Sequence, residues 1–211
     1  MNAPPQRLGR ADLSLAVRAL AERDPELGAL VRAHGEPPLW GRRGGFATLV
    51  KIILEQQVSL ASARTLFARL ERGLGAVTPE AVLRQGSTGL RALGLTRQKA
   101  VSVGDLAAHV ARGELPIARL GRLSDEAARA SLLRVRGIGP WTADIYLLMA
   151  LRRPDVWPQG DLALHRMLQV IDPGGRLPTA LEAMERSARW APWRAVAARI
   201  LWHSYLSARA A

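Results

Sequence analysis

The 211-residue chain contains no cysteine, which excludes disulfides, zinc–thiolate sites and iron–sulfur clusters. Lysine is almost absent as well, because Lys51 and Lys99 are the only two among 30 basic residues. No apolar run reaches the length of a membrane span, and the first ten residues, MNAPPQRLGR, lack the apolar core of a signal peptide. These absences predict a cytoplasmic location and no membrane partner.

Positive charge is what the chain has in excess. Its formal net charge is +12 and its sequence pI is about 11.5. Such an excess suits a polyanionic partner, and binding of this kind weakens steeply as salt rises. The alternative is a basic surface that binds no polyanion, and charge alone does not separate the two.

Apolar residues recur at helical spacing through nearly the whole chain, and no window alternates in the manner of a strand. Residues typical of helix starts punctuate this pattern: Asp12, Asp24-Pro25, Ser59, Thr78, Thr96, Ser124, Thr179 and Pro192. One apolar helix is predicted over residues 46–57, and a short turn or helix over 86–95. The pattern predicts an all-α fold of about ten helices joined by short loops, without an iron–sulfur cluster.

A glycine hairpin, GIGP at residues 137–140, separates two of the predicted helices, DEAARASLLRV and PWTADIYLLMAL. Glycine lets the backbone turn tightly and come close to a ligand, so bare N–H groups could face a phosphate at the start of the second helix. A tight turn with no ligand is the alternative. The position between two helices of a very basic chain favours a helix–hairpin–helix that binds nucleic acid.

Asp161 follows Gly160 and precedes the apolar run LALHRMLQVI, so we expect its carboxylate to cap a helix N-terminus. The helix dipole favours negative charge at that position, which suits charge stabilisation better than proton donation. A purely structural cap is the alternative. Asp144, inside the helix that follows the hairpin, is the competing carboxylate, and we interpret it as structural.

Five ordered segments carry a family resemblance: LEQQVSLASA (54–63), LGLTRQKA (93–100), GIGPWTA (137–143), PQGDLALHR (158–166) and APWRAVAARILW (191–202). In this order and spacing the chain resembles the helix–hairpin–helix DNA glycosylase superfamily, and within it the DNA-3-methyladenine glycosylase II branch. The resemblance implies one glycosylase domain over residues 1–211, with two subdomains flanking a cleft. One subdomain would comprise 1–45 and about 165–211; the other would comprise about 46–164, including the hairpin at 134–152.

The resemblance also implies an activity. The enzyme would flip an alkylated base, of the 3-methyladenine or 7-methylguanine type, out of double-stranded DNA and hydrolyse its N-glycosidic bond. Bifunctional members carry a lysine two residues after the second hairpin glycine, where this chain has Trp141. We therefore expect an abasic site without strand cleavage. No cofactor is implied, and a monomer is expected, associated with the nucleoid if the cell is bacterial.

Residue roles follow by position within the family signature. Asp161, 22 residues after Gly139, would be catalytic, and Trp141 and Trp202 would line the base pocket. The predicted DNA-binding residues are Gln57, Val58, Ser59, Arg136, Gly137, Ile138, Gly139, Thr142 and Arg166. Lys99 is a further candidate phosphate contact. No metal is predicted beyond a candidate monovalent-cation position at the Gly137–Gly139 hairpin.

Some alternatives stay open. Gln57 with Val58 and Ser59 could fill the gap left by a flipped nucleotide, or the Gln56-Gln57 pair could simply end a helix. Trp190 and Trp193 are interpreted as core residues. The lesion could instead be 8-oxoguanine, uracil or hypoxanthine, and a non-catalytic helix–hairpin–helix module that only binds DNA is the alternative from another class.

Overall fold

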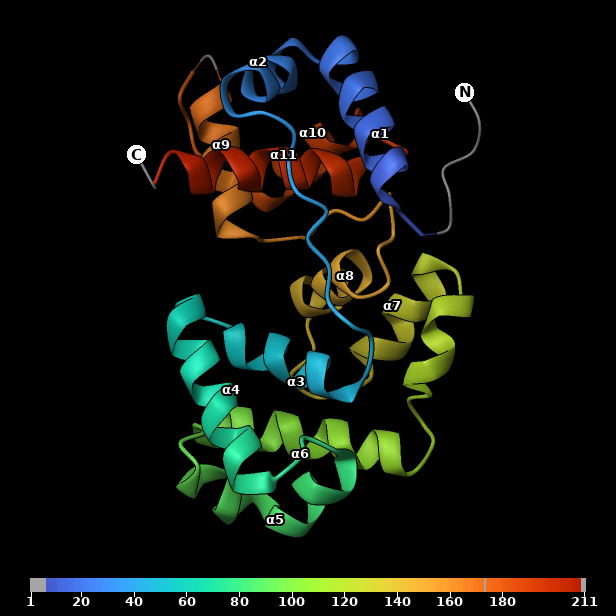
Figure 1. The fold of residues 1–211 in the computed structure, drawn as a ribbon, viewed down its shortest axis with the longest axis vertical. Coiled ribbons are helices and arrows are strands. Elements are labelled where there is room, and N and C mark those ends of the chain that lie inside the picture. Colours follow the sequence, from blue (N-terminus) through green and yellow to red (C-terminus); the bar gives the residue numbers. More distant parts are fainter. Residues whose placement is uncertain (1–6, 173, 210–211) are drawn as a thin grey trace. The chain divides into compact units, whose positions relative to one another are not determined.

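The computed structural model describes residues 7–172 and 174–209 (Figure 1). Within these ranges the chain forms eleven α-helices and one 3-10 helix, and no strand. This confirms the predicted all-α fold. No helix in these ranges combines the length and apolar character needed to cross a bilayer. The chain divides into two compact units: unit 1 comprises Met1–Gly41 and Arg152–Ala211, and unit 2 comprises Arg42–Leu151.

Unit 1 is built around its last helix. Its helices are α1 (Arg10–Arg23), α2 (Pro25–His34), α9 (Leu162–Ile171), α10 (Ala180–Ala188) and α11 (Arg194–Ser207). Helix α11 contacts each of the other four, and its residues Ala195 to Leu201 are nearly all inaccessible to solvent. Trp190, just before α11, is fully buried, and its indole N–H donates to Asp24 Oδ2 at 2.7 Å. With Trp193 also buried, the interpretation of both tryptophans as core residues is confirmed.

Unit 2 contains the hairpin. Its helices are α3 (Phe46–Glu55), α4 (Leu60–Leu74), α5 (Pro79–Ala92), α6 (Arg97–Ala111), the 3-10 helix η1 (Ile117–Arg122), α7 (Asp125–Leu133) and α8 (Pro140–Met149). The apolar helix α3 contacts α4, α6 and α8, and α5 and α6 lie side by side (Figure 1). Ile52, Ile53 and Leu54 of α3 are completely buried. Because α3 is central in this unit, its C-terminal end lies close to both α6 and the hairpin.

Local hydrogen bonds account for most helix starts. Seven of the expected residues accept an N–H from the first turn of their helix: Asp24, Ser59, Thr78, Thr96, Ser124, Asp161 and Thr179. Asp12 is different, because α1 begins after Gly9, and the Asp12 carboxylate accepts the Gly9 N–H at 2.8 Å. Pro192 is different too, since α11 begins two residues later, after Trp193.

Two helices can be compared with the predicted ranges in more detail. Helix α3 ends at Glu55 rather than at residue 57 because Gln56 leaves the helical region with ψ 126° and Gln57 then adopts a left-handed conformation with φ 58°. The short turn or helix predicted over residues 86–95 is confirmed, because helical backbone resumes after Gly86, whose φ of 63° and ψ of 173° kink α5 at that residue. In both places the backbone leaves the helical region of φ and ψ, which interrupts helical hydrogen bonding.

The segment Arg152 to Gly160 belongs to unit 1, whereas the sequence placed the second unit boundary near residue 164. Arg152 O accepts the Leu8 N–H at 2.8 Å, and Pro154 O accepts the Ala195 N–H at 3.0 Å. Arg194 makes a bidentate pair with Asp155, with N···O distances of 2.9 and 2.8 Å. These long-range bonds tie the segment to α1 and α11, and no helical periodicity in the sequence reveals them.

Candidate functional site

The hairpin between α7 and α8 is a tight turn in which Gly137 is required for two separate reasons, its backbone conformation and its packing. The Ile138 N–H donates to Val135 O at 3.1 Å, and Gly137 within this turn has φ 86°. A Cβ added to Gly137 would lie 2.0 Å from Ser102 Oγ and 2.4 Å from Ser102 Cβ. Both the backbone conformation and the packing against α6 therefore exclude a side chain at position 137.

Gly139 faces the opposite situation. Its φ of −91° and ψ of 179° suit any residue, and a Cβ added there would meet nothing within 4 Å. Gly139 is the N-cap of α8, whose positive end favours an anion. Neither the Gly137 N–H nor the Gly139 N–H donates to any acceptor within the described residues. The outer face of the turn thus combines free amides with open space for a phosphate.

Gln56, at the C-terminal end of α3, holds the hairpin from inside. Its Nε2 donates to Gly137 O at 2.9 Å and to Thr142 Oγ1 at 2.8 Å. Side-chain amides carry two donors, and here both are used across 81 and 86 residues of sequence. Sequence reasoning missed this role. The available signal was an amide at the end of an otherwise apolar helix.

The other residues predicted to bind DNA fall into exposed and buried sets. Gln57, Val58 and Ser59 are exposed in the loop between α3 and α4, and the Ser59 hydroxyl accepts the Ser62 N–H at 3.1 Å. Ile138 and Thr142 have buried side chains, so only their backbone could meet a ligand. A gap-filling role for Gln57 or Val58 stays a prediction.

Charged contacts around the hairpin are mainly structural. Asp144 is fully buried and accepts from Arg129 Nε at 2.7 Å, which links α7 to α8 as its structural interpretation requires. Lys99 Nζ donates to Leu54 O at 2.7 Å, so this ammonium caps the C-terminal end of α3. Burial lowers the pKa of Lys99. An ammonium has three donors and this bond uses one of them, so the phosphate contact of Lys99 stays a prediction.

The candidate cation position can be compared with the hairpin. A monovalent cation there would need backbone carbonyl oxygens, and the Gly137 carbonyl already accepts the Gln56 amide. A carbonyl has a second lone pair, so this bond leaves room for a ligand, and the cation position stays a prediction. Among the residues with described positions, no cluster of three or more His, Cys, Asp or Glu could hold a metal ion.

The carboxylate site lies in unit 1. Asp161 is the N-cap of α9, and its Oδ1 accepts the Leu164 N–H at 3.1 Å. The same oxygen accepts the indole N–H of Trp202, from α11, at 3.1 Å. Two donors on one oxygen fix the orientation of the carboxylate plane. Asp161 and Trp202 are each half-buried, so the group remains reachable from solvent.

The remaining predicted residues are placed as follows. Arg166 lies one turn after Asp161 on α9 and is exposed. Trp141 is half-buried in the first turn of α8, in unit 2. The structure therefore joins Trp202 to Asp161 by a direct hydrogen bond, and it places Trp141 next to the hairpin glycines.

The described part of the chain is thus an all-α protein that combines a helix–hairpin–helix with a capped, half-buried carboxylate. The family model described as "HhH-GPD superfamily base excision DNA repair protein" matches residues 50–192. The chain belongs to this family. The match covers the α3 end, the hairpin and Asp161.

Individual relatives agree. The chain is 31% identical over 169 residues to a protein named DNA-3-methyladenine glycosylase from Bacillus subtilis, covering 74% of this chain and 56% of that protein. A Bacillus halodurans structure titled DNA-3-methyladenine glycosidase has a TM-score of 0.80 at 27% identity, covering 92% of this chain and 91% of that one. The Schizosaccharomyces pombe 3-methyladenine DNA glycosylase Mag1, solved with abasic DNA, has a TM-score of 0.81 at 25% identity, covering 92% and 96%.

The chain spans between 40% and 65% of the length of the first curated relatives that it matches.

Proposed function

We propose that this protein is a DNA glycosylase that excises alkylated bases and leaves an abasic site. The observation that carries the proposal is the Asp161 carboxylate, held by the Leu164 N–H and the Trp202 indole N–H on one oxygen. A protein that only binds DNA has no need of a carboxylate fixed in this way within a very basic chain. The names of the relatives support the alkylated-base class.

Hydrolysis of an N-glycosidic bond builds positive charge on the sugar in an oxocarbenium-like transition state. A fixed anion such as Asp161 would stabilise that charge without having to reorganise. Water then adds its oxygen to C1′ of the sugar, the C1′–N bond electrons leave with the base, and one proton of the water is released. Asp161 can orient the water and accept this proton.

An alkylated purine such as 3-methyladenine or 7-methylguanine carries positive charge while it is attached to the sugar. It departs as a neutral molecule, so no general acid is required. This matches a site with one held carboxylate. A cationic base is also attracted to the face of an indole, and Trp202 or Trp141 could supply about 0.5–2 kcal/mol of such selectivity.

The hairpin would hold the DNA backbone while this reaction occurs. Its two glycine N–H groups and the N-terminus of α8 provide a phosphate site, and Trp141 stands where a lyase would need an amine nucleophile. We therefore expect base release without strand cleavage. Borohydride should not trap a covalent complex between the protein and DNA, since trapping requires a Schiff base formed by an amine.

The test is a panel of duplex oligonucleotides that each carry one damaged base, with base release measured by chromatography and abasic sites by alkaline cleavage. The wild-type protein should release 3-methyladenine and 7-methylguanine. Asp161→Asn keeps the shape and the cap but removes the charge, and it should reduce the single-turnover rate by at least about 100-fold, as loss of a transition-state electrostatic contact does. Its affinity for DNA should be unchanged.

Trp202→Phe is the companion variant, because it keeps an aromatic ring and removes the N–H donor to Asp161. We expect a smaller loss of rate than for Asp161→Asn. Release of only 8-oxoguanine, uracil or hypoxanthine would move the protein to another lesion class. An Asp161→Asn variant as active as wild type would refute the mechanism, and DNA binding without release of any base would favour the non-catalytic module.

A further inference from the structure

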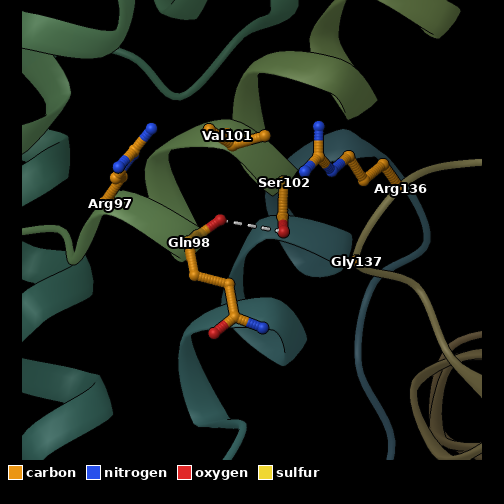
Figure 2. Close-up of a pocket in the computed structure, with 6 residues that line it drawn as sticks. All are labelled: Arg97, Gln98, Val101, Ser102, Arg136 and Gly137. Carbon is orange, nitrogen blue, oxygen red and sulfur yellow. Dashed lines mark hydrogen bonds between the residues drawn. The ribbon is translucent and has the colours of Figure 1, made fainter.

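A second feature of unit 2 lies beside the hairpin, and of its residues only Arg136 and Gly137 were among those predicted to bind DNA. The first two turns of α6 and the hairpin line a cavity of about 550 Å³ that is open to solvent. Its lining residues are Arg97, Gln98, Val101, Ser102, Arg136 and Gly137. In Figure 2 the side chains of Arg97 and Arg136 lie on either side of Val101.

The two arginines are available to a ligand. Both are exposed, and across residues 7–172 and 174–209 neither guanidinium has a hydrogen bond or an ion pair. The backbone of Arg136 is nevertheless fixed, since its N–H donates to Asp105 Oδ2 at 2.8 Å. That carboxylate holds the main chain of the hairpin and does not line the cavity. Two unpaired cations therefore stand on a rigid support at one cavity.

The lining between the two arginines is partly apolar. Ser102 is buried, and its hydroxyl already donates to Gln98 O at 3.0 Å (Figure 2). Val101 contributes an apolar, half-exposed surface between the two arginines. A nucleic-acid backbone presents this combination, because its phosphates are anionic and the carbons of its deoxyribose are apolar.

We propose that Arg97 and Arg136 bind a second DNA phosphate, adjacent on the same strand to the phosphate held by the hairpin amides. Gly137 belongs both to the hairpin turn and to the cavity wall, so a strand seated on the turn continues along the cavity. Arginine suits this task since its planar guanidinium donates to phosphate oxygens in a bidentate way. The proposal rests on the proposed function only in taking DNA as the partner.

Its role is to fix the register of the strand. One phosphate contact leaves a strand free to pivot, whereas two neighbouring contacts define its direction. Contacts to phosphate carry no sequence information, so the site should act equally on damaged and undamaged duplex.

The first experiment measures the dissociation constant of an undamaged duplex as a function of salt. Arg97→Ala and Arg136→Ala should each reduce the slope of log K against log salt by about 0.9, and the double variant by about 1.8. Between about 50 and 200 mM salt, each variant should therefore lose roughly 3.5-fold less affinity than wild type. Arg18→Ala, which removes an exposed positive charge from α1, should leave the slope unchanged.

The second experiment locates the phosphate. Single phosphates of one strand are replaced in turn by neutral methylphosphonates, and wild-type affinity should fall at two adjacent positions. In the Arg97→Ala/Arg136→Ala variant, sensitivity should disappear at one of these positions and persist at the other. Gly139→Ala, which places a methyl group on the open face of the hairpin, should show the reverse pattern.

Several results would overturn the proposal. These are unchanged salt slopes, an equal effect of Arg18→Ala, or retention of both sensitive positions in the double variant. Inorganic phosphate, titrated alone and followed by NMR shifts of the cavity residues, distinguishes a site for free anions: saturation by phosphate with unchanged DNA slopes would also contradict it. Failure of the proposed function is separate, because it would appear as absence of base release by wild type.

Discussion

Substitution of alanine for each of the two hairpin glycines should affect different properties: stability at Gly137 and DNA affinity at Gly139. Gly137→Ala forces a side chain onto a residue with φ 86° and drives its Cβ to 2.4 Å from Ser102 Cβ. A left-handed conformation costs a residue with a Cβ about 1–2 kcal/mol. Overpacking against a fixed neighbour costs about 1–3 kcal/mol more. We therefore expect Gly137→Ala to lower the free energy of unfolding by about 2–5 kcal/mol.

Gly139→Ala is the matched control, since it adds the same methyl group two residues away. That position has φ −91° and nothing within 4 Å of the added carbon. Alanine is a poorer N-cap than glycine, so a cost of up to about 1 kcal/mol is expected. What should fall is DNA affinity, because the methyl group occupies the space that a phosphate needs in order to approach the amides.

Urea unfolding followed by circular dichroism measures the first effect, and fluorescence anisotropy of a labelled duplex measures the second. A double-mutant cycle with Ser102→Gly isolates the packing part. Ser102→Gly costs about 1 kcal/mol by helix propensity, but it removes the atoms that Gly137→Ala would strike. The coupling energy should be about 1–3 kcal/mol in favour of the double variant. Equal stability of the two glycine variants, or zero coupling, would refute this account of the turn.

Two further predictions concern other contacts. Gln56→Ala removes both amide hydrogen bonds to the hairpin and should destabilise the protein by about 1–3 kcal/mol, with a loss of DNA affinity; urea unfolding with the duplex titration measures both, and unchanged values would contradict the role of Gln56. Hydrogen bonds from Arg176 lower the pKa of Glu182 from 4.5 to about 2, so its ionised form stabilises the folded state. That contribution should be fully present above about pH 4.5 and lost as the pH falls toward 2. In the Glu182→Gln variant the urea-unfolding midpoint should therefore change less with pH over this range than in wild type. The same pH dependence in both proteins would disprove this role of Glu182.

Helix type and most helix starts could be predicted because their causes are local. An N-cap is a hydrogen bond across two or three residues, so the helix starts at Ser59, Thr78 and Thr96 could be predicted from the local sequence. The capping position of Asp161 was predictable for the same reason. The glycine pair also marked the hairpin. Where prediction failed, at the end of α3, the reason was a backbone turn at Gln56 and Gln57 that no periodicity encodes.

Tertiary structure decided which of these groups act together. Nothing in the local pattern indicates that the Trp202 indole donates to Asp161, 41 residues earlier, or that the Lys99 ammonium caps α3. These contacts depend on how helices pack, and packing maximises burial over the whole unit rather than within one segment. The sequence by itself determined an all-α chain with a glycine turn and a capped carboxylate. Packing alone made Gly137 a buried contact and left Gly139, two residues away, open to a ligand.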